Sequence, residues 1–300
     1  MTQDDRHERL RRLTAEMVET YSRLDGINRL GEKNLPDQLT IASILTDLRA
    51  LMFPGYFGPP VAADADLEAL VADRLEAVRQ RLAEAIRRTL EFCHHNDCIC
   101  EELWTDLDAQ GPGKFGAAAD RITDDYLGRL PAIREELALD VAAAYEGDPA
   151  ASNIEEVILC YPGVLAITVH RLAHPLHRAG VPLLPRIMSE WAHRHSGVDI
   201  HPGADIGPWF FIDHGTGVVI GETTSIGARV KIYQGVTLGA IGFRRNPDAT
   251  LDKGGKRNPD SGTYVTSYAG ATSHGGEPVN GDAAVVAGGT WNTDACEPAE

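Results

Sequence analysis

The stretch GVDIHPGADIGPWFFIDHGTGVVIGETTSIGARVKIYQGVTLGA, from Gly197 to Ala240, decides the fold. Glycines and small residues in it separate aliphatic residues that recur every six positions, with one shift of two residues; these are Ile200, Ile206, Ile212 and Val218, then Ile220, Ile226, Ile232 and Leu238. Such a short, fixed period is typical of a β-solenoid, in which each six-residue unit forms one flat side of a three-sided prism. The pattern predicts a left-handed parallel β-helix of hexapeptide repeats with the aliphatic side chains stacked inside.

The chain before this stretch follows a different period. Apolar residues recur at helical spacing from Leu10 to about Ser196, for example at Leu67, Val71 and Leu75. Proline and glycine mark the breaks, as in Glu146-Gly147-Asp148-Pro149, where a helix is expected to end. The sequence therefore predicts an α + β protein, with an all-helical N-terminal domain at 1–196 and a β-helix domain at 197–300.

Composition narrows the class of function. The 300 residues include 43% hydrophobic and 24% charged residues, which is ordinary for a soluble globular chain, and the formal net charge is −16. This acidic balance argues against a nucleic-acid partner, because no excess of Lys and Arg exists to displace phosphate counterions. No apolar run approaches the roughly 20 residues that span a bilayer, and the start MTQDDRHERLRRL lacks the apolar core of a signal peptide. We expect a cytoplasmic protein without a membrane partner.

Clusters of cysteine and histidine raise the question of a metal. The five cysteines are an odd number in a chain long enough to bury a core, so free thiols are expected. The segment from Cys93 to Cys100 concentrates soft ligands, but its spacing matches no usual zinc pattern. His170, His174 and His177 recur at near-helical spacing without an acid or cysteine at similar spacing, which favours packing. We expect no metal.

Longer motifs resemble the serine acetyltransferase family. They are Val198 to Ala204, Phe211 to Thr223 and Gln234 to Ala240, preceded by the helical approach Glu146 to Ala150 and Tyr161-Pro162-Gly163. The resemblance implies transfer of the acetyl group of acetyl-CoA to the hydroxyl of L-serine, the first step of cysteine biosynthesis. It also implies a homotrimer or a dimer of trimers, in which the helical domain drives oligomerisation and the active sites lie between subunits.

Acetyl transfer to serine needs a base, because an alcohol that keeps its proton is a poor nucleophile toward a thioester. His214 is the candidate, since it lies in a glycine-rich loop where the six-residue register is interrupted. Asp199 is expected to accept the other imidazole N–H and to stabilise the imidazolium. The family uses such a histidine–aspartate pair, and capping of the first coil is the alternative role for Asp199.

L-Serine is a zwitterion, so its pocket should offer carboxylates to the ammonium and a cation to the carboxylate. By resemblance, Asp148 and Asp213 match the ammonium-binding acids of the family and Arg257 matches its carboxylate-binding arginine. Taken alone, Asp148 is a helix end and Arg257 a solvated loop residue. Gly239 and Ala240 are expected to approach the acyl arm of acetyl-CoA, because little side chain stands in the way.

The chain departs from the family beyond the central motifs. Asn258 stands where the family usually has a histidine, which joins an acid–histidine contact with the match of Glu222, and asparagine cannot titrate. The C-terminal isoleucine by which some members dock into cysteine synthase is replaced by Glu297-Pro298-Ala299-Glu300. We therefore expect no such complex.

The six-residue count also predicts polar residues inside the last coils. It places Ser261, Ser267 and Ser273 in the prism, followed in a second register by Asn280, Val286 and Asn292. A buried hydroxyl or amide without a partner costs roughly 1–3 kcal/mol. We therefore expect residues 242–300 to be divergent and poorly ordered.

Other functions stay open at this point. Another acyl-CoA transferase of hexapeptide fold would accept a different hydroxyl or amine, although Asp148, Asp213 and Arg257 together favour an α-amino acid. A catalytically impaired relative that serves as an oligomeric scaffold is favoured by Asn258 and the polar coils. A metal-dependent hexapeptide hydratase is disfavoured, because no constellation of three histidines is visible at solenoid spacing.

Overall fold

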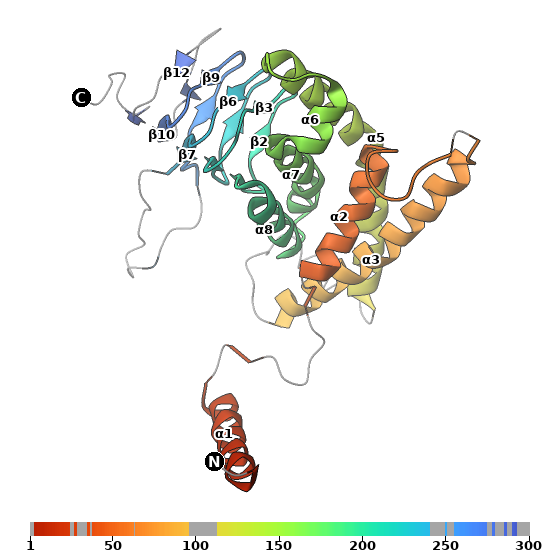
Figure 1. Cartoon of the computed structure of the whole chain (residues 1–300), viewed down its shortest axis with the longest axis vertical. Helices are drawn as coiled ribbons and strands as arrows, with labels where there is room; N and C mark the ends of the chain where they lie inside the picture. The colour runs from red at the N-terminus through yellow and green to blue at the C-terminus, as the bar shows by residue number, and fades with distance from the viewer. Residues whose placement is uncertain are drawn as a thin grey trace. The chain divides into compact units, whose positions relative to one another are not determined.

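The structure, a computed structural model, describes residues 3–24, 27–28, 35–36, 38–62, 64–95, 113–240, 250, 255–274, 278–279, 285–286 and 290–292. It divides into two units, Met1–Leu35 and Pro36–Glu300. The first unit holds helix α1 (Gln3–Arg23), an amphipathic helix with no buried residue. Figure 1 shows the order of the elements.

The second unit begins with six helices among its described residues. Their apolar faces enclose one core, to which Leu48, Leu82, Leu137 and Leu172 contribute fully buried side chains. The helices are α2 (Gln38–Met52), α3 (Leu67–His95), α5 (Lys114–Gly147), α6 (Ile154–Cys160), α7 (Pro162–Arg178) and α8 (Leu184–Ser196). As the glycine and proline predicted, α5 ends at Gly147, directly before Asp148 and Pro149.

The described helices contain no single one that is long and apolar enough to cross a membrane. Helices α6 and α7 are joined by a bend of 72°. Taken together, the two would be long and apolar enough for a membrane span by length and composition only.

After α8 the chain winds through short parallel strands. The first seven are β1 (Asp199–Ile200), β2 (Asp205–Ile206), β3 (Phe211–Ile212), β4 (Val219–Ile220), β5 (Ser225–Ile226), β6 (Lys231–Ile232) and β7 (Thr237–Gly239). Six more follow: β8 (Asp260–Ser261), β9 (Thr266–Ser267), β10 (Thr272–His274), β11 (Pro278–Val279), β12 (Val285–Val286) and β13 (Thr290–Asn292). They form three parallel sheets with the orders β1-β4-β7-β10-β13, β11-β8-β5-β2 and β12-β9-β6-β3. Since every third strand pairs, each sheet is one side of a prism, as in Figure 1.

The interior of the prism is built by the predicted repeat. Ile200 pairs with Ile220, which pairs with Leu238, and Ile206 pairs with Ile226. All of these side chains are buried in a second apolar cluster, separate from the helical core. The six-residue period therefore predicted the inward face correctly.

The polar inward positions lie in the predicted register. Ser261 pairs with Ile226, Ser267 with Ile232 and Ser273 with Leu238, so each serine continues an aliphatic column. Within the described part of the chain, the Oγ atoms of Ser261 and Ser273 are buried without a hydrogen-bond partner. Strands β8, β9 and β10 nevertheless pair along their length with the coil below.

The predicted register of the last coil was partly wrong. The residues that pair with the three serines are Val279, Val286 and Trp291, whereas Asn280 and Asn292 were predicted there. The count fails because the interval from Val279 to Val286 is longer than six residues and the next interval is shorter. The residue at the second position, Val286, was predicted correctly.

A buried ion pair joins the helical layer to the prism. Arg171 of α7 donates to both carboxylate oxygens of Asp140 of α5, at 2.5 and 2.9 Å, and to the carbonyl oxygens of Ile206 and Gly207, at 3.0 and 2.9 Å. Asp140 Oδ1 also accepts from the backbone N–H of Phe210 at 2.9 Å. Helices α5, α7 and α8 pack against β1 and β3. The first coil is therefore fixed against these helices.

Candidate active site

The C-terminal end of α5 and the corner after β3 bring two acids and a histidine together. Asp148 directly follows α5, and Asp213 and His214 directly follow β3. The Nδ1 atom of His214 lies 3.9 Å from Asp213 Oδ1. His214 has a φ of 58° and a side chain that is 72% exposed, so its imidazole is open to a substrate. An exposed imidazole beside two carboxylates can accept a proton next to a bound cation.

The Tyr-Pro-Gly motif explains how these two segments meet. Gly163, in the first turn of α7, lies so close to β3 that an added Cβ would be 2.2 Å from the carbonyl oxygen of Ile212. Any larger residue would push α7 away from the coil that carries Asp213. The contact brings Tyr161, which precedes α7, near the end of α5.

Asp148 is held in its ionised form. The hydroxyl of Tyr161 donates to Asp148 Oδ2 at 2.5 Å, and the backbone N–H of Ala150 donates to Oδ1 at 2.8 Å. These two hydrogen bonds, helped by the nearby charges of Lys231 and His214, lower the pKa of Asp148 below its ordinary value. Burial and the bond to Asp148 raise the pKa of Tyr161, so the phenol keeps the proton that it donates.

A lysine that sequence reasoning missed lies in this group. Lys231 Nζ lies 3.3 Å from Asp213 Oδ2 and donates to the backbone carbonyl of Gly147 at 2.7 Å. Tyr161 was also missed as a functional residue, although the Tyr-Pro-Gly motif had been recognised. Neither side chain stands out by spacing, because its partners lie on other elements of the chain.

Within one chain, Asp199 lies apart from His214. Its Oδ1 is 4.0 Å from Arg186 Nη1 of α8, and its carboxylate clusters with Glu190 and His193 of the same helix. Among the described contacts, no hydrogen bond or ion pair joins Asp199 to His214 of the same chain. The cluster could offer three ligand atoms to a metal, but Arg186 also pairs with Glu190 and already supplies a positive charge there.

Arg257 and Glu222 form an ion pair at a different corner, which follows β4. The imidazoles of His177 and His201 lie beside this pair and meet edge to face, with ring centroids 5.7 Å apart. Burial lowers the pKa of His201 to about 4, against the opposing charge of Glu222. Glu222 therefore lies close enough to these histidines, which come from α7 and from the first coil, to act on their pKa values through its charge.

Asn258 is a structural residue in this chain. It is buried, its Oδ1 accepts from the backbone N–H of Thr223 at 3.0 Å, and its side chain fills the space above Gly221. The hydroxyl of Thr223 accepts from the backbone N–H groups of Arg257 and Asn258 at 3.0 and 2.9 Å. This network fixes the backbone of Arg257 beside Glu222.

Gly239 and Ala240 lie at the end of β7, both half-buried. They belong to the sheet that contains β1 and β4, so the end of β7 stacks on the corner of Glu222. Their predicted contact with acetyl-CoA stays a prediction.

The histidines of α7 pack as the sequence suggested. His170 is buried, and desolvation lowers its pKa well below the usual value. His174 Nδ1 lies 2.9 Å from the carbonyl oxygen of Pro202. Cys93 is buried and Cys160 is exposed, and neither forms a disulfide bond, whereas Cys98 and Cys100 lie outside the described residues.

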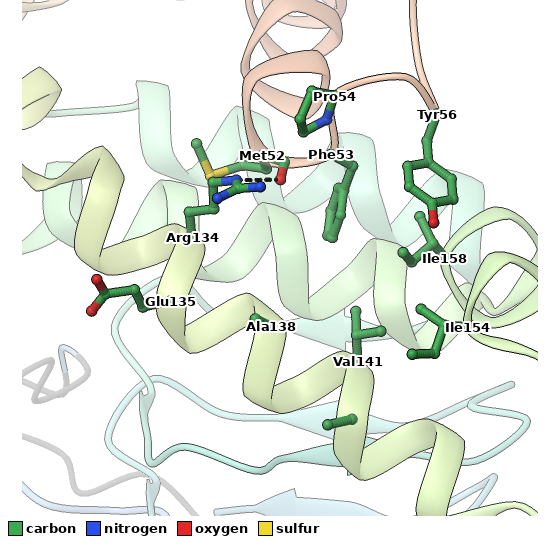
Figure 2. Close-up of a pocket in the computed structure, with 11 residues that line it drawn as sticks. Met52, Phe53, Pro54, Tyr56, Arg134, Glu135, Ala138, Val141, Ile154 and Ile158 are labelled. Atoms are coloured by element: carbon green, nitrogen blue, oxygen red, sulfur yellow. Dashed lines mark hydrogen bonds between the residues drawn. The ribbon is translucent and has the colours of Figure 1, made fainter. Parts of the chain in front are cut away.

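A well-formed pocket lies away from all of these groups. It has a volume of about 400 Å³ between α2, α5 and α6, and Figure 2 shows apolar side chains such as Phe53, Val141 and Ile158 around it. Arg134 at its edge donates to the carbonyl oxygen of Met52 at 3.1 Å. None of the predicted site residues lines this pocket.

Several known proteins are similar to this chain in sequence and fold. A Synechococcus elongatus protein described as "Serine acetyltransferase, plasmid" is 44% identical over 264 residues, which cover 86% of this chain and 78% of that protein. Native serine acetyltransferase 1 from Entamoeba histolytica has a TM-score of 0.63 at 32% identity and covers 88% and 87% of the two chains. The Neisseria gonorrhoeae serine acetyltransferase in complex with serine has a TM-score of 0.50 at 26% identity and covers 88% and 92%. No family profile matches the chain.

A helical domain followed by a left-handed β-helix of hexapeptide coils defines an acyltransferase of the hexapeptide-repeat class. The similarity in sequence and fold extends over most of the chain. This chain belongs to the serine acetyltransferase family. The predicted fold class and the predicted acyltransferase of cysteine biosynthesis are thereby confirmed, and the family implies acetyl-CoA as cosubstrate.

Proposed function

We propose that this serine acetyltransferase works by direct attack of the L-serine hydroxyl on acetyl-CoA, with His214 as general base. The observation that carries the proposal is the meeting of Asp148, Asp213 and the exposed imidazole of His214 at one edge of the prism. A carboxylate pair can bind the substrate ammonium while the adjacent imidazole reaches the hydroxyl.

The two substrates and His214 account for every bond and proton in the reaction. His214 accepts the hydroxyl proton as the serine oxygen forms a bond to the acetyl carbonyl carbon. The tetrahedral intermediate then collapses, the carbon–sulfur bond breaks, and the imidazolium returns its proton to the departing thiolate of CoA. The products are O-acetyl-L-serine and CoA, and no other reactant is needed.

The acids Asp148 and Asp213 of one subunit are proposed to meet the Arg257–Glu222 pair of a neighbouring subunit. Asp148 and Asp213 lie near the corner after β3, whereas Arg257 and Glu222 lie at the corner after β4. In a homotrimer of three-sided prisms, one corner of a subunit can face a different corner of its neighbour. The neighbour would then supply Arg257 to the serine carboxylate, and Glu222 would orient that guanidinium.

Asp199 is proposed to orient His214 in the assembled site. The small residues Gly239 and Ala240 are proposed to let the acyl arm of acetyl-CoA approach the coil backbone. We propose that catalysis needs no metal, since the base, the acids and the cation are all side chains. A cytoplasmic location and the lack of a cysteine synthase complex stay predictions.

The test is release of free thiol from acetyl-CoA in the presence of L-serine, with the wild type and His214→Asn. Asparagine is suited to the left-handed backbone of His214, so the change removes the imidazole without adding strain. We expect turnover to fall by about 10²- to 10⁴-fold while the oligomer and thermal stability are unchanged. His214→Ala should lose activity equally.

Two outcomes would contradict the proposal. Turnover of His214→Asn close to that of the wild type would remove His214 as base. Faster thiol release with another hydroxyl or amine acceptor than with L-serine would identify a different acyl-CoA transferase.

A further inference from the structure

Lys231 occupies a particular place among the proposed substrate-binding acids. Its Nζ lies 3.3 Å from Asp213 Oδ2 and 2.7 Å from the carbonyl oxygen of Gly147, the residue directly before Asp148. One ammonium group therefore contacts the side chain of one acid and the backbone next to the other. These two segments come from the β-helix and from α5, and they are more than sixty residues apart in the sequence.

The position of this ammonium is fixed by its surroundings. The rings of Phe211 and Tyr233 flank it, with centroids 4.9 and 4.5 Å from Nζ, and only 20% of the Lys231 side chain is exposed. A cation at the C-terminal end of a helix such as α5 is favoured by the helix dipole. Aromatic faces add further attraction for a cation that has lost much of its water.

The charges of this group match a substrate with one ammonium. Asp148 and Asp213 contribute two negative charges, and Lys231 cancels one of them. Asp148 accepts hydrogen bonds from the Tyr161 hydroxyl and the Ala150 N–H. Asp213 contacts Lys231 through Oδ2, and its Oδ1 faces His214. Without Lys231, the Asp213 carboxylate would lose its charged partner and its orientation toward the base.

We propose that Lys231 is a positioning residue for the serine site, which holds Asp213 and the end of α5 in the arrangement that binds the substrate ammonium. The inference rests on the proposed function, since it takes these acids as the ammonium site. Lys231 is not expected to contact the reacting atoms. It acts through Asp213 and Asp148.

The experiment compares Lys231→Met, which keeps the length and apolar stem, with Lys231→Arg, which keeps the charge. Arg229→Met is the matched control, because Arg229 lies two residues away on the same coil, and its guanidinium covers the ring of Trp209 at 4.3 Å. A hydrogen bond to a charged group corresponds to about a 10- to 100-fold change in binding. We expect Lys231→Met to raise the KM for L-serine by about that factor, with the KM for acetyl-CoA changed less than about twofold. Lys231→Arg should restore most of the loss, and Arg229→Met should leave both KM values close to those of the wild type.

Three results would overturn the role of Lys231. An unchanged or lower KM for L-serine in Lys231→Met would show that the lysine is dispensable or competes with the substrate ammonium. Equal rises in both KM values with a lower Tm would show a general structural role. Failure of Lys231→Arg to restore serine binding would exclude positioning by charge.

A binding measurement separates this inference from the proposed reaction. L-Serine is titrated calorimetrically into wild type and Lys231→Met, each saturated with CoA. Serine binding that Lys231→Met weakens, together with no thiol release by the wild type, would support Lys231 and refute acetyl transfer. A wild type that binds no L-serine would refute both.

Discussion

Residues with left-handed backbone occur at corners of the prism, and they are supported in different ways. Trp209, Arg229 and Tyr264 have φ values of 61°, 59° and 60°, and the Arg229 guanidinium lies over both rings, 4.3 and 5.7 Å from their centroids. Their contacts with one another offset the unfavourable backbone. His214 has the same conformation with an exposed side chain and a long contact to Asp213. Backbone strain at an exposed imidazole is typical of a functional position.

Tyr161→Phe is predicted to change the pH dependence of the enzyme. The Tyr161 hydroxyl is the leading cause of the lowered pKa of Asp148, so its removal should raise that pKa toward the ordinary value. Because only the ionised acid binds an ammonium, serine binding is present above this pKa and is lost as the pH falls through it. The pH at which L-serine binding is lost should therefore be higher in the variant than in the wild type. Binding is the suitable measure, because kcat/KM also depends on His214 being unprotonated as the base.

The measurement is the Kd of L-serine as a function of pH, determined by calorimetry in a buffer series in which the folded state is checked by circular dichroism. Tyr145→Phe is the control, since Tyr145 is an exposed tyrosine on α5 and its replacement is expected to leave the pH dependence of serine binding unchanged. A pH dependence of serine binding in Tyr161→Phe that coincides with that of the wild type would show that the Tyr161 hydroxyl does not control the ionisation of a serine-binding acid.

At the level of single elements, the coils differ in what fills them. The columns that start with Ile200, Ile206 and Ile212 are aliphatic through β7 and continue with serine in β8, β9 and β10. Ser267 and Ser273 are buried almost as completely as the residues that they follow. The strands pair because their backbone bonds do not depend on the inward side chain, but the apolar contribution of these three inward positions is lost.

Replacing the three serines by isoleucine is predicted to stabilise the protein. Each isoleucine would add roughly 1.5–3 kcal/mol of burial, and the change would remove the unpartnered hydroxyls of Ser261 and Ser273. We expect a higher Tm and a higher free energy of unfolding for the triple variant. Thermal and denaturant unfolding of parent and variant would measure both.

The matched control replaces the same serines by alanine, which removes the hydroxyls without filling the space. Alanine should stabilise less than isoleucine if volume is the main defect. A triple isoleucine variant that melts at or below the parent Tm would indicate that the prism has no room, since overpacking costs about 1–3 kcal/mol.

Across the whole molecule, the six-residue repeat could be predicted from the sequence, whereas the contacts between distant segments could not. The period predicted the inward residues from Ile200 to Ser273 because each coil repeats the same local geometry. The slip at Asn280 and Asn292 arose where the intervals of the last coil depart from six residues. Periodicity carries no information about Lys231 and Gly147, which meet only after folding. The family resemblance predicted the acids and His214, but not the side chains that hold them.

The Arg171–Asp140 pair is the most buried charged contact between the helical layer and the prism in the described part of the chain. Arg171 is 6% exposed and Asp140 is 1% exposed, and together they bond to three backbone groups of the first coil. Every donor and acceptor in this group has a partner at the interface, so the pair cannot be broken without leaving a buried charge.

Arg171→Met is therefore predicted to cost about 3–5 kcal/mol in the free energy of unfolding, because it leaves the Asp140 carboxylate buried and unpaired. The double variant Arg171→Met, Asp140→Leu should be less destabilised than Arg171→Met alone, since no unpaired charge remains. The exposed pair of Arg79 and Asp124, whose nearest atoms are 2.8 Å apart, provides the control. Arg79→Met should cost at most about 1 kcal/mol. Denaturant unfolding of the four proteins decides the matter, and a cost for Arg171→Met as small as that for Arg79→Met would show that the first coil is held to the helices by apolar packing alone.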